Sequence, residues 1–245
     1  MAQPVVGKPA PATIKPHSQT LYRDWVNNYV TKDFLLGKVN RTKDTVFVHV
    51  GPAHTERNIY LLRPVYEAFK EMYDAALADG VKLVITSGHR TFVDQVCEWQ
   101  LKYDNAEFQA IRDPVERARK LLQYRSVPGS SRHHWGTDID MNSIKLHYFE
   151  TAEGKKMYEW LQENAHRFGF HQPYTAFNKY RQDGYNEEKW HWSYLPIASL
   201  MLEKFEKEVS MEDFKGFHGD KAVQQLSIIS KWVRGIDSRL YMADL

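Results

Sequence analysis

At residues 131–140 the chain reads SRHHWGTDID, and this stretch decides how the fold is organised. His133 comes before Gly136, and residues 137–142 then alternate acidic and apolar side chains, as a half-buried strand does. Glycine lets a chain reverse, so a side chain before the turn can approach one after it. We therefore expect His133 and Asp140 to lie close together, offering an imidazole nitrogen and a carboxylate oxygen to a metal ion.

A second histidine-containing stretch, EKWHW, lies at residues 188–192. His191 can supply a third ligand, and a catalytic zinc uses three protein ligands with one open position. Glu188, three residues before it, is then free to take a proton from a water molecule. Because the ligands come from separate segments, the arrangement differs from a helical HExxH site. The sequence predicts one Zn²⁺ held by His133, Asp140 and His191.

The composition is that of an ordinary globular chain. Its 245 residues allow one large domain or two small ones and a substantial core. The 33 basic and 31 acidic residues nearly cancel, so nothing in the charge suggests a nucleic acid partner, and no apolar run is long enough to span a membrane. Cys97 is the only cysteine, which excludes an intramolecular disulfide and a thiolate zinc cluster. Its apolar neighbours on a predicted helix indicate a buried, inert thiol.

The periodicity of apolar residues predicts a mixture of helices and short strands. Helices are expected over 61–80, 91–103, 113–124, 154–170, 198–209 and 223–236, and strands over 45–50, 82–86, 137–142 and 189–195. Because the strands mostly look antiparallel, we expect an α+β fold rather than a doubly wound sheet, with a small antiparallel sheet carrying the zinc site and helices flanking it. We divide the chain into a tail or linker (1–18), the zinc domain (19–196) and a C-terminal helical extension packed on that domain (197–245).

Three motifs in this order resemble the VanY-like zinc D-Ala-D-Ala carboxypeptidases, which belong to the superfamily of lysostaphin, the D-Ala-D-Ala metallopeptidases and the hedgehog signalling domain. The motifs are Ser-Gly-x-Arg-(x4)-Gln at 87–95, Ser-x-His-x-x-Gly-x-x-x-Asp at 131–140 and Glu-x-Trp-His at 188–191. The helix EWLQENAHRFGF is similar to the family's helix between the two metal motifs. The resemblance spans residues 45–196 and implies a zinc peptidase.

The resemblance also implies a role for each matching residue. It makes His133, Asp140 and His191 the ligands and Glu188 the general base. The arginine of the family binds the peptide carboxylate or the developing oxyanion, and here that residue is Arg90. Gln95 and Ser131 match positions that assist substrate binding.

Asp138 departs from the family, which usually has a small apolar residue at that position. It precedes Asp140 by two residues, so both face the same side of a strand. We group it with the substrate-binding residues and expect it either beside a ligand or competing for the metal. His134 should point away from the site. We interpret His54, His166, His171 and His218 as structural residues, and Trp190 and Trp192 as packing that fixes the strand carrying His191.

The function implied by the resemblance is removal of the terminal D-alanine from peptidoglycan stem peptides. An L,D-carboxypeptidase, a D,D-dipeptidase and a cross-link endopeptidase use the same chemistry. An endopeptidase would not need a carboxylate clamp, so Arg90 and Ser131 favour a carboxypeptidase. A non-catalytic, zinc-stabilised binding domain is the alternative from another class, and an intact Glu188 argues against it. The substrate predicts a cell-envelope or periplasmic location, although residues 1–18 lack the apolar run of a signal peptide.

Overall fold

The computed structural model describes residues 16–123 and 125–241. The expected tail therefore lies largely outside the described residues, which begin in helix α1 (Pro16–Tyr29). This helix was not predicted. Between residues 19 and 29 only Val26 is buried, because α1 lies on the surface of helix α8 (Leu195–Glu208). With so narrow a buried face, the sequence carries almost no apolar periodicity.

Two small antiparallel sheets confirm the α+β prediction. The larger has the strand order β3-β4-β6-β5, and the smaller pairs β1 with β2. The strands are β1 (Phe47–His49), β2 (Tyr60–Leu62), β3 (Ile85–Ser87), β4 (Asp138–Met141), β5 (Phe170–His171) and β6 (His191–Tyr194). The predicted strands are present, whereas β2 and β5 were missed because they overlap the ends of the helices predicted over 61–80 and 154–170.

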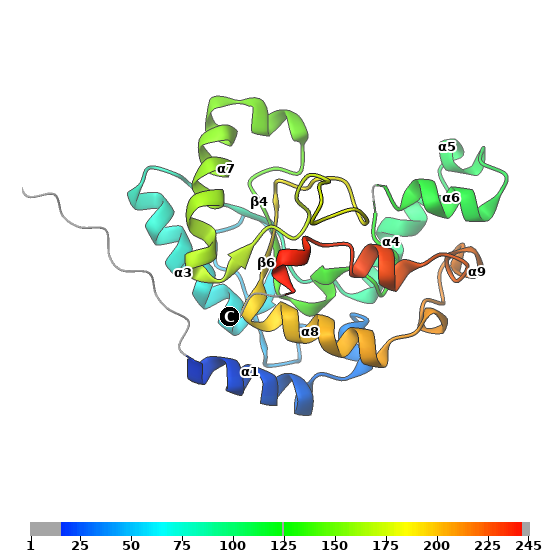
Figure 1. Cartoon of the computed structure of the whole chain (residues 1–245), viewed down its shortest axis with the longest axis horizontal. Coiled ribbons are helices and arrows are strands. Elements are labelled where there is room, and N and C mark those ends of the chain that lie inside the picture. Colours follow the sequence, from blue (N-terminus) through cyan, green and yellow to red (C-terminus); the bar gives the residue numbers. More distant parts are fainter. Residues whose placement is uncertain (1–15, 124, 242–245) are drawn as a thin grey trace, which may run out of the picture.

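Helices surround the sheet, as expected (Figure 1). Besides α1 and α8 they are α2 (Lys32–Leu35), α3 (Arg63–Ala78), α4 (Phe92–Tyr103), α5 (Ala106–Gln109), α6 (Pro114–Leu121), α7 (Ala152–Asn164) and α9 (Asp220–Val223). In Figure 1, α5 and α6 extend to one side, while α3 and α7 lie at the opposite side. Among the described residues, no helix combines the length and apolarity that a bilayer crossing requires.

The helix predicted over 223–236 is wrong. Helix α9 ends at Val223, and a separate π-helical turn spans Ile228–Val233. In a π turn, residues five apart stand one above the other, and both Ile228 and Val233 are buried. Tertiary burial of these two side chains therefore overrides the 3.6-residue period that the sequence suggested.

Two burial predictions also need correction. Strand β4 is buried on both faces rather than one, because all four of its residues, which point alternately to the two faces, are buried. Its carboxylates therefore need partners inside the protein. Cys97 is exposed, not buried. The buried stripe of α4 runs through Gln95, Trp99 and Tyr103 at four-residue intervals, which turns Cys97 toward solvent.

Gly136 makes the turn between His133 and β4, as expected. It ends a short 3-10 helix, η1 (Arg132–Trp135), with φ of 70°. A Cβ atom there would lie 2.8 Å from a ring carbon of Phe47 and 3.3 Å from Leu62. We expect Gly136→Ala to lower the free energy of unfolding by about 2–4 kcal/mol, because left-handed backbone strain adds to a steric clash in the core. Urea denaturation would measure this loss.

Gly216 provides the matched control. Its φ is 88°, but a Cβ atom there would meet nothing within 4 Å. Gly216→Ala should therefore show the backbone strain alone, a loss of about 1 kcal/mol. Equal losses for the two variants would mean that the contact with Phe47 relaxes without cost.

Candidate metal centre

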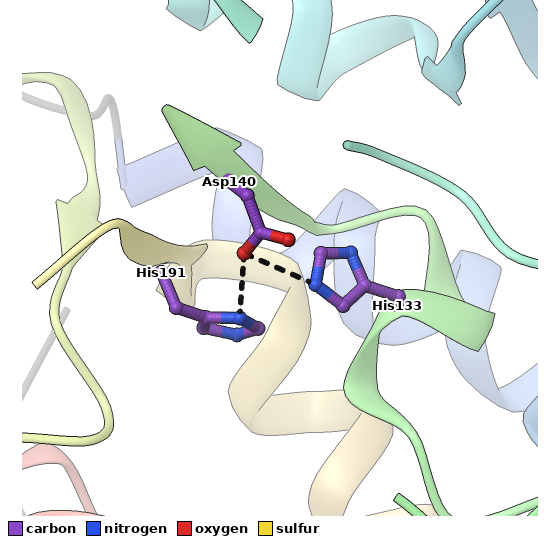
Figure 2. Close-up of side chains that lie close together, drawn as sticks. All are labelled: His133, Asp140 and His191. Atoms are coloured by element: carbon purple, nitrogen blue, oxygen red, sulfur yellow. Dashed lines mark hydrogen bonds and ion pairs between the residues drawn. The ribbon is translucent and has the colours of Figure 1, made fainter. Parts of the chain in front are cut away.

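The three expected ligands converge on one point (Figure 2). Nε2 of His133 lies 3.4 Å from Oδ1 of Asp140, and Nδ1 of His191 lies 3.1 Å from the same oxygen. One ligand atom from each residue falls within 4.8 Å of the others, and all three residues are buried. Asp140 and His191 stand directly opposite each other in the β4–β6 pair, whereas His133 is delivered by η1. The metal site predicted from the sequence is therefore assembled by one strand pair and one glycine turn.

In each imidazole, the nitrogen that faces away from Asp140 is engaged in a hydrogen bond with the protein. The nitrogen that faces Asp140 is therefore the one available to a metal. Nδ1 of His133 donates to the carbonyl oxygen of Gly88 at 2.9 Å, and Nε2 of His191 donates to Oδ1 of Asp138 at 3.0 Å. Because these oxygens only accept, those nitrogens carry the hydrogens, and in the neutral rings the lone pairs are on the nitrogens that face Asp140. Imidazoles that bind metals are oriented in this way in most proteins.

The electrostatic environment favours a positive charge at this point. Burial alone would lower the pKa of His191, but its bonds to Asp138 and Asp140 raise it to about 10. Burial would raise the pKa of Asp140, yet His133 and His191 hold it below its usual range. The same two carboxylates would also favour a metal cation here, which would replace the proton on Nδ1 of His191. Two imidazole nitrogens and one carboxylate oxygen are a donor set suited to Zn²⁺.

Glu188 lies beside the metal group, the set formed by His133, Asp140 and His191, but is not one of the three. Its Oε2 lies 3.6 Å from Nδ1 of His191, and 26% of its side chain remains exposed. Its backbone N–H donates to the carbonyl of Tyr174 at 2.9 Å, which holds the residue in place. Burial raises the pKa of Glu188 to about 7, partly offset by His191 and reinforced by Asp140. A carboxyl group with this pKa can both accept and return a proton near neutral pH.

A cavity of about 550 Å³ opens over the metal group and Glu188. Arg90 and Ser131 line it, as expected for substrate-binding residues. The Arg90 guanidinium is held from three sides: it donates to Oε1 of Gln95 at 2.8 Å, to Oε2 of Glu98 at 3.4 Å and to Oγ of Ser87 at 3.3 Å. The size of the cavity is that of a small-molecule or short-peptide site.

Gln95 supports Arg90 instead of facing the cavity. It is fully buried, and its Nε2 donates to the carbonyl oxygen of Ser126 at 2.8 Å while its Oε1 accepts from Arg90. Both ends of the side chain are therefore committed to the protein. The expected role in substrate binding becomes an indirect one, exerted through the guanidinium.

Asp138 also differs from its expected role. It is fully buried, and its carboxylate contacts Nε2 of His191, the nitrogen that faces away from Asp140. It therefore neither binds substrate directly nor competes for the metal. His134 lies outside the metal group, as expected, but on η1 rather than on a strand: its ring donates to the carbonyl of Arg90 and accepts from the N–H of Gly129. His54 and His218 bond Tyr66 and Asp104 instead.

Aromatic side chains that the sequence did not single out complete the wall of the cavity. Tyr174 lies with its ring 4.9 Å from that of His191, and Tyr185 packs against Tyr174 at 5.1 Å. Both come from the irregular segment 172–188, where no periodicity marks them. Trp192 is buried as predicted, whereas Trp190 both packs on Phe149 and lines the cavity.

The C-terminal extension contacts the segment 172–188 through backbone hydrogen bonds and one aromatic pair. The backbone N–H of Asp237 donates to Pro173 and that of Ser238 to Tyr180, each at 2.9 Å. The ring of Trp232 packs 5.1 Å from that of Tyr185. The wall of the cavity and the backbone anchor of Glu188 thus depend on residues far beyond the metal motifs.

Comparisons with known proteins agree with this geometry. A family model described as "VanY: D-alanyl-D-alanine carboxypeptidase" matches residues 58–197. A D-alanyl-D-alanine carboxypeptidase of Enterococcus faecalis is 33% identical over 138 residues, which cover 53% of this chain and 46% of that protein. One of Enterococcus faecium is 30% identical over 169 residues, covering 68% of this chain and 48% of that protein. The chain thus spans about half the length of these two relatives.

A solved structure shares the fold. It is that of a mutant of the vancomycin-resistance D,D-pentapeptidase VanY, from a VanB-type resistance cassette, in complex with Zn(II). The similarity has a TM-score of 0.50 at 25% sequence identity, and it covers 76% of this chain and 93% of that chain.

Proposed function

Because the chain belongs to the VanY family of D-alanyl-D-alanine carboxypeptidases, we propose that it is a zinc-dependent carboxypeptidase that removes the terminal D-alanine from peptidoglycan stem peptides. The observation that carries the proposal is the position of Glu188. It lies beside three converging ligands on a cavity that also presents Arg90. When bound by His133, Asp140 and His191, zinc polarises a carbonyl group and makes a coordinated water more acidic.

Two side chains, Glu188 and Arg90, perform the remaining steps: proton transfer and binding of the substrate carboxylate. Glu188 accepts a proton from the attacking water and returns it to the nitrogen of the leaving D-alanine, so the water oxygen bonds to the carbonyl carbon as the C–N bond breaks. Arg90 offers a planar fork of N–H donors that matches a free carboxylate. Since Ser87, Gln95 and Glu98 hold the guanidinium, little rotamer entropy is lost when it binds.

The alternatives are less well supported by these contacts. A cross-link endopeptidase does not require a clamp for a C-terminal carboxylate, and Arg90 supplies N–H donors suited to one. A non-catalytic zinc domain would have no use for a carboxyl group whose burial raises the pKa to about 7 beside the metal group, as at Glu188. The substrate class also places the reaction at the cell envelope.

Defined muropeptides test the proposal. We expect the zinc-loaded protein to release a single alanine from a pentapeptide ending in D-Ala-D-Ala, as followed by mass spectrometry, and to leave a tetrapeptide and a cross-linked dimer intact. Release of a dipeptide would indicate a D,D-dipeptidase. Cleavage of the tetrapeptide would indicate an L,D-carboxypeptidase, and cleavage of the dimer an endopeptidase. No turnover of any of them would favour the binding domain.

Arg90→Ala should lower kcat/KM on the free pentapeptide by about 10–100-fold, mainly through KM. The loss corresponds to about one hydrogen bond to a charged group, which contributes roughly 1.5–3 kcal/mol. The control is a pentapeptide amidated at its C-terminus, on which the wild type should already be slow and the substitution should matter little. An equal loss on both substrates would place Arg90 on the carbonyl oxygen instead of the carboxylate.

A further inference from the structure

A buried ion pair lies directly behind the imidazole of His191. Nε of Arg132 donates to Oδ1 of Asp138 at 3.1 Å, and their side chains are only 1% and 0% exposed. The same Oδ1 accepts from Nε2 of His191 at 3.0 Å. The other carboxylate oxygen accepts from Oγ1 of Thr137 at 2.5 Å. The Asp138 carboxylate thus accepts all three of these hydrogen bonds.

The strand pairing explains why these groups meet. Asp138 stands opposite Ser193, and Asp140 stands opposite His191. His191 is thus flanked on one strand by two carboxylates, one at each ring nitrogen. Nη2 of Arg132 donates to Oγ of Ser193 at 2.7 Å, so the guanidinium bridges β4 and β6 at the residue pair next to the metal ligands.

We propose that Arg132 and Asp138 are a positioning pair that holds His191 with its hydrogen on Nε2, so that Nδ1 is ready to bind zinc, and that they thereby raise the affinity of the chain for the metal. The inference rests on the proposed zinc site. Arg132 pairs with Asp138 and points it at the ring, and Asp138 fixes both the tautomer and the rotation of the imidazole. Partners of this kind contribute about 10–100-fold to metal affinity.

A purely structural ion pair predicts something different. Replacing a buried pair by apolar residues of similar size is often neutral or stabilising, whereas removing one partner leaves a charge buried alone. The double variant therefore separates the two roles. Stability should return when both charges are removed, while zinc affinity should not, because His191 still lacks its acceptor.

The test is a competition for zinc between the full chain and a chromophoric chelator, with thermal unfolding recorded in parallel. We expect Asp138→Leu to weaken zinc binding about 10–100-fold, and Asp138→Asn, which keeps an acceptor and the shape, to weaken it less. Arg132→Met should lower both the melting temperature and the affinity. Arg132→Met combined with Asp138→Leu should regain the melting temperature but not the affinity.

Asn164→Ala serves as the control for a general loss of stability. Asn164 is buried in α7, and its amide bonds Trp160 and Arg167. This variant should melt earlier and bind zinc as the wild type does. Wild-type zinc affinity in Asp138→Leu, or its recovery in the double variant, would overturn the inference.

The zinc-binding experiment can fail independently of the proposed peptidase activity. No substrate enters the measurement, so a protein that binds zinc with the expected order of affinities but cleaves no muropeptide would refute the activity alone. Imidazole ¹H–¹⁵N spectra give a second readout. The zinc-bound wild type should show the Nε2–H signal of His191, and Asp138→Leu should lose its protection from exchange.

Discussion

Replacing Glu188 with alanine should reduce kcat for D-alanine release by about 10³-fold, within the range of 10²–10⁴-fold that a positioned general base supplies. The variant should still bind one zinc ion, because Glu188 lies outside the group formed by His133, Asp140 and His191. The other carboxylate beside Nδ1 of His191 is that of Asp140, which we expect to be occupied by the metal, so the variant should lack a base for the water. Steady-state kinetics and metal analysis of the same preparation would measure both quantities.

Glu187→Gln is the matched control for this prediction. It removes the carboxylate one residue earlier, and kcat should change by no more than a few-fold. If Glu188→Ala keeps its activity, Glu188 is not the general base. If the variant loses its zinc, Glu188 is a metal ligand.

The same residue sets the acid side of the pH profile. A protonated Glu188 cannot accept a proton, so kcat/KM should fall as the pH drops through the pKa of this carboxyl group. Burial raises that pKa to about 7. The positive charge of a bound zinc ion lowers it again, so the inflection is expected at or below pH 7.

Asp140→Ala should abolish activity by removing the metal. Its Oδ1 faces both imidazoles, 3.4 Å from Nε2 of His133 and 3.1 Å from Nδ1 of His191. Losing one of three ligands should cost about 3–5 kcal/mol of binding energy, or roughly 10²–10³-fold or more in affinity, judged against the 10–16 kcal/mol of a full zinc site. Chelation of the wild type should have the same effect, and added zinc should restore only the wild type.

Thermal unfolding with and without zinc gives the measurement. A metal that binds only the folded state raises its stability, so the melting temperature of the wild type should rise with zinc and that of Asp140→Ala should not. Asp104→Ala is the control. Asp104 forms an Asp–His pair with His218 at 2.7 Å, but these side chains are 43% and 61% exposed. This variant should keep the full response to zinc, and a zinc-induced shift in Asp140→Ala would exclude Asp140 as a ligand.

Parts of the fold could be read from local sequence because the signal for them is local. Helix α3 has enough apolar residues on one face to show its period, and Gly80, at φ of 70°, lies just beyond its end, as predicted. The candidate ligands were proposed in a similar way, from His133 and Asp140 on either side of Gly136 and from His191 in a separate segment.

Other features could not be predicted because they depend on contacts between distant segments. Cys97 is exposed because of which face of α4 packs inward, and Gln95 turns to Arg90 because Ser126 is there to accept its amide. The aromatic wall formed by Tyr174 and Tyr185 comes from a segment without any period. It is held by a C-terminal extension whose π turn the sequence presents as an ordinary helix.

The sequence by itself determined which residues are candidates to hold the metal and which carboxylate is the candidate base, since these follow from side-chain chemistry and spacing along the chain. Only the tertiary structure decided which nitrogen of each imidazole faces the metal. That choice lies with Gly88 and Asp138, which accept the other ring hydrogen. The strand register brings Asp138 to His191, a residue 53 positions away, so it depends on how two distant segments meet.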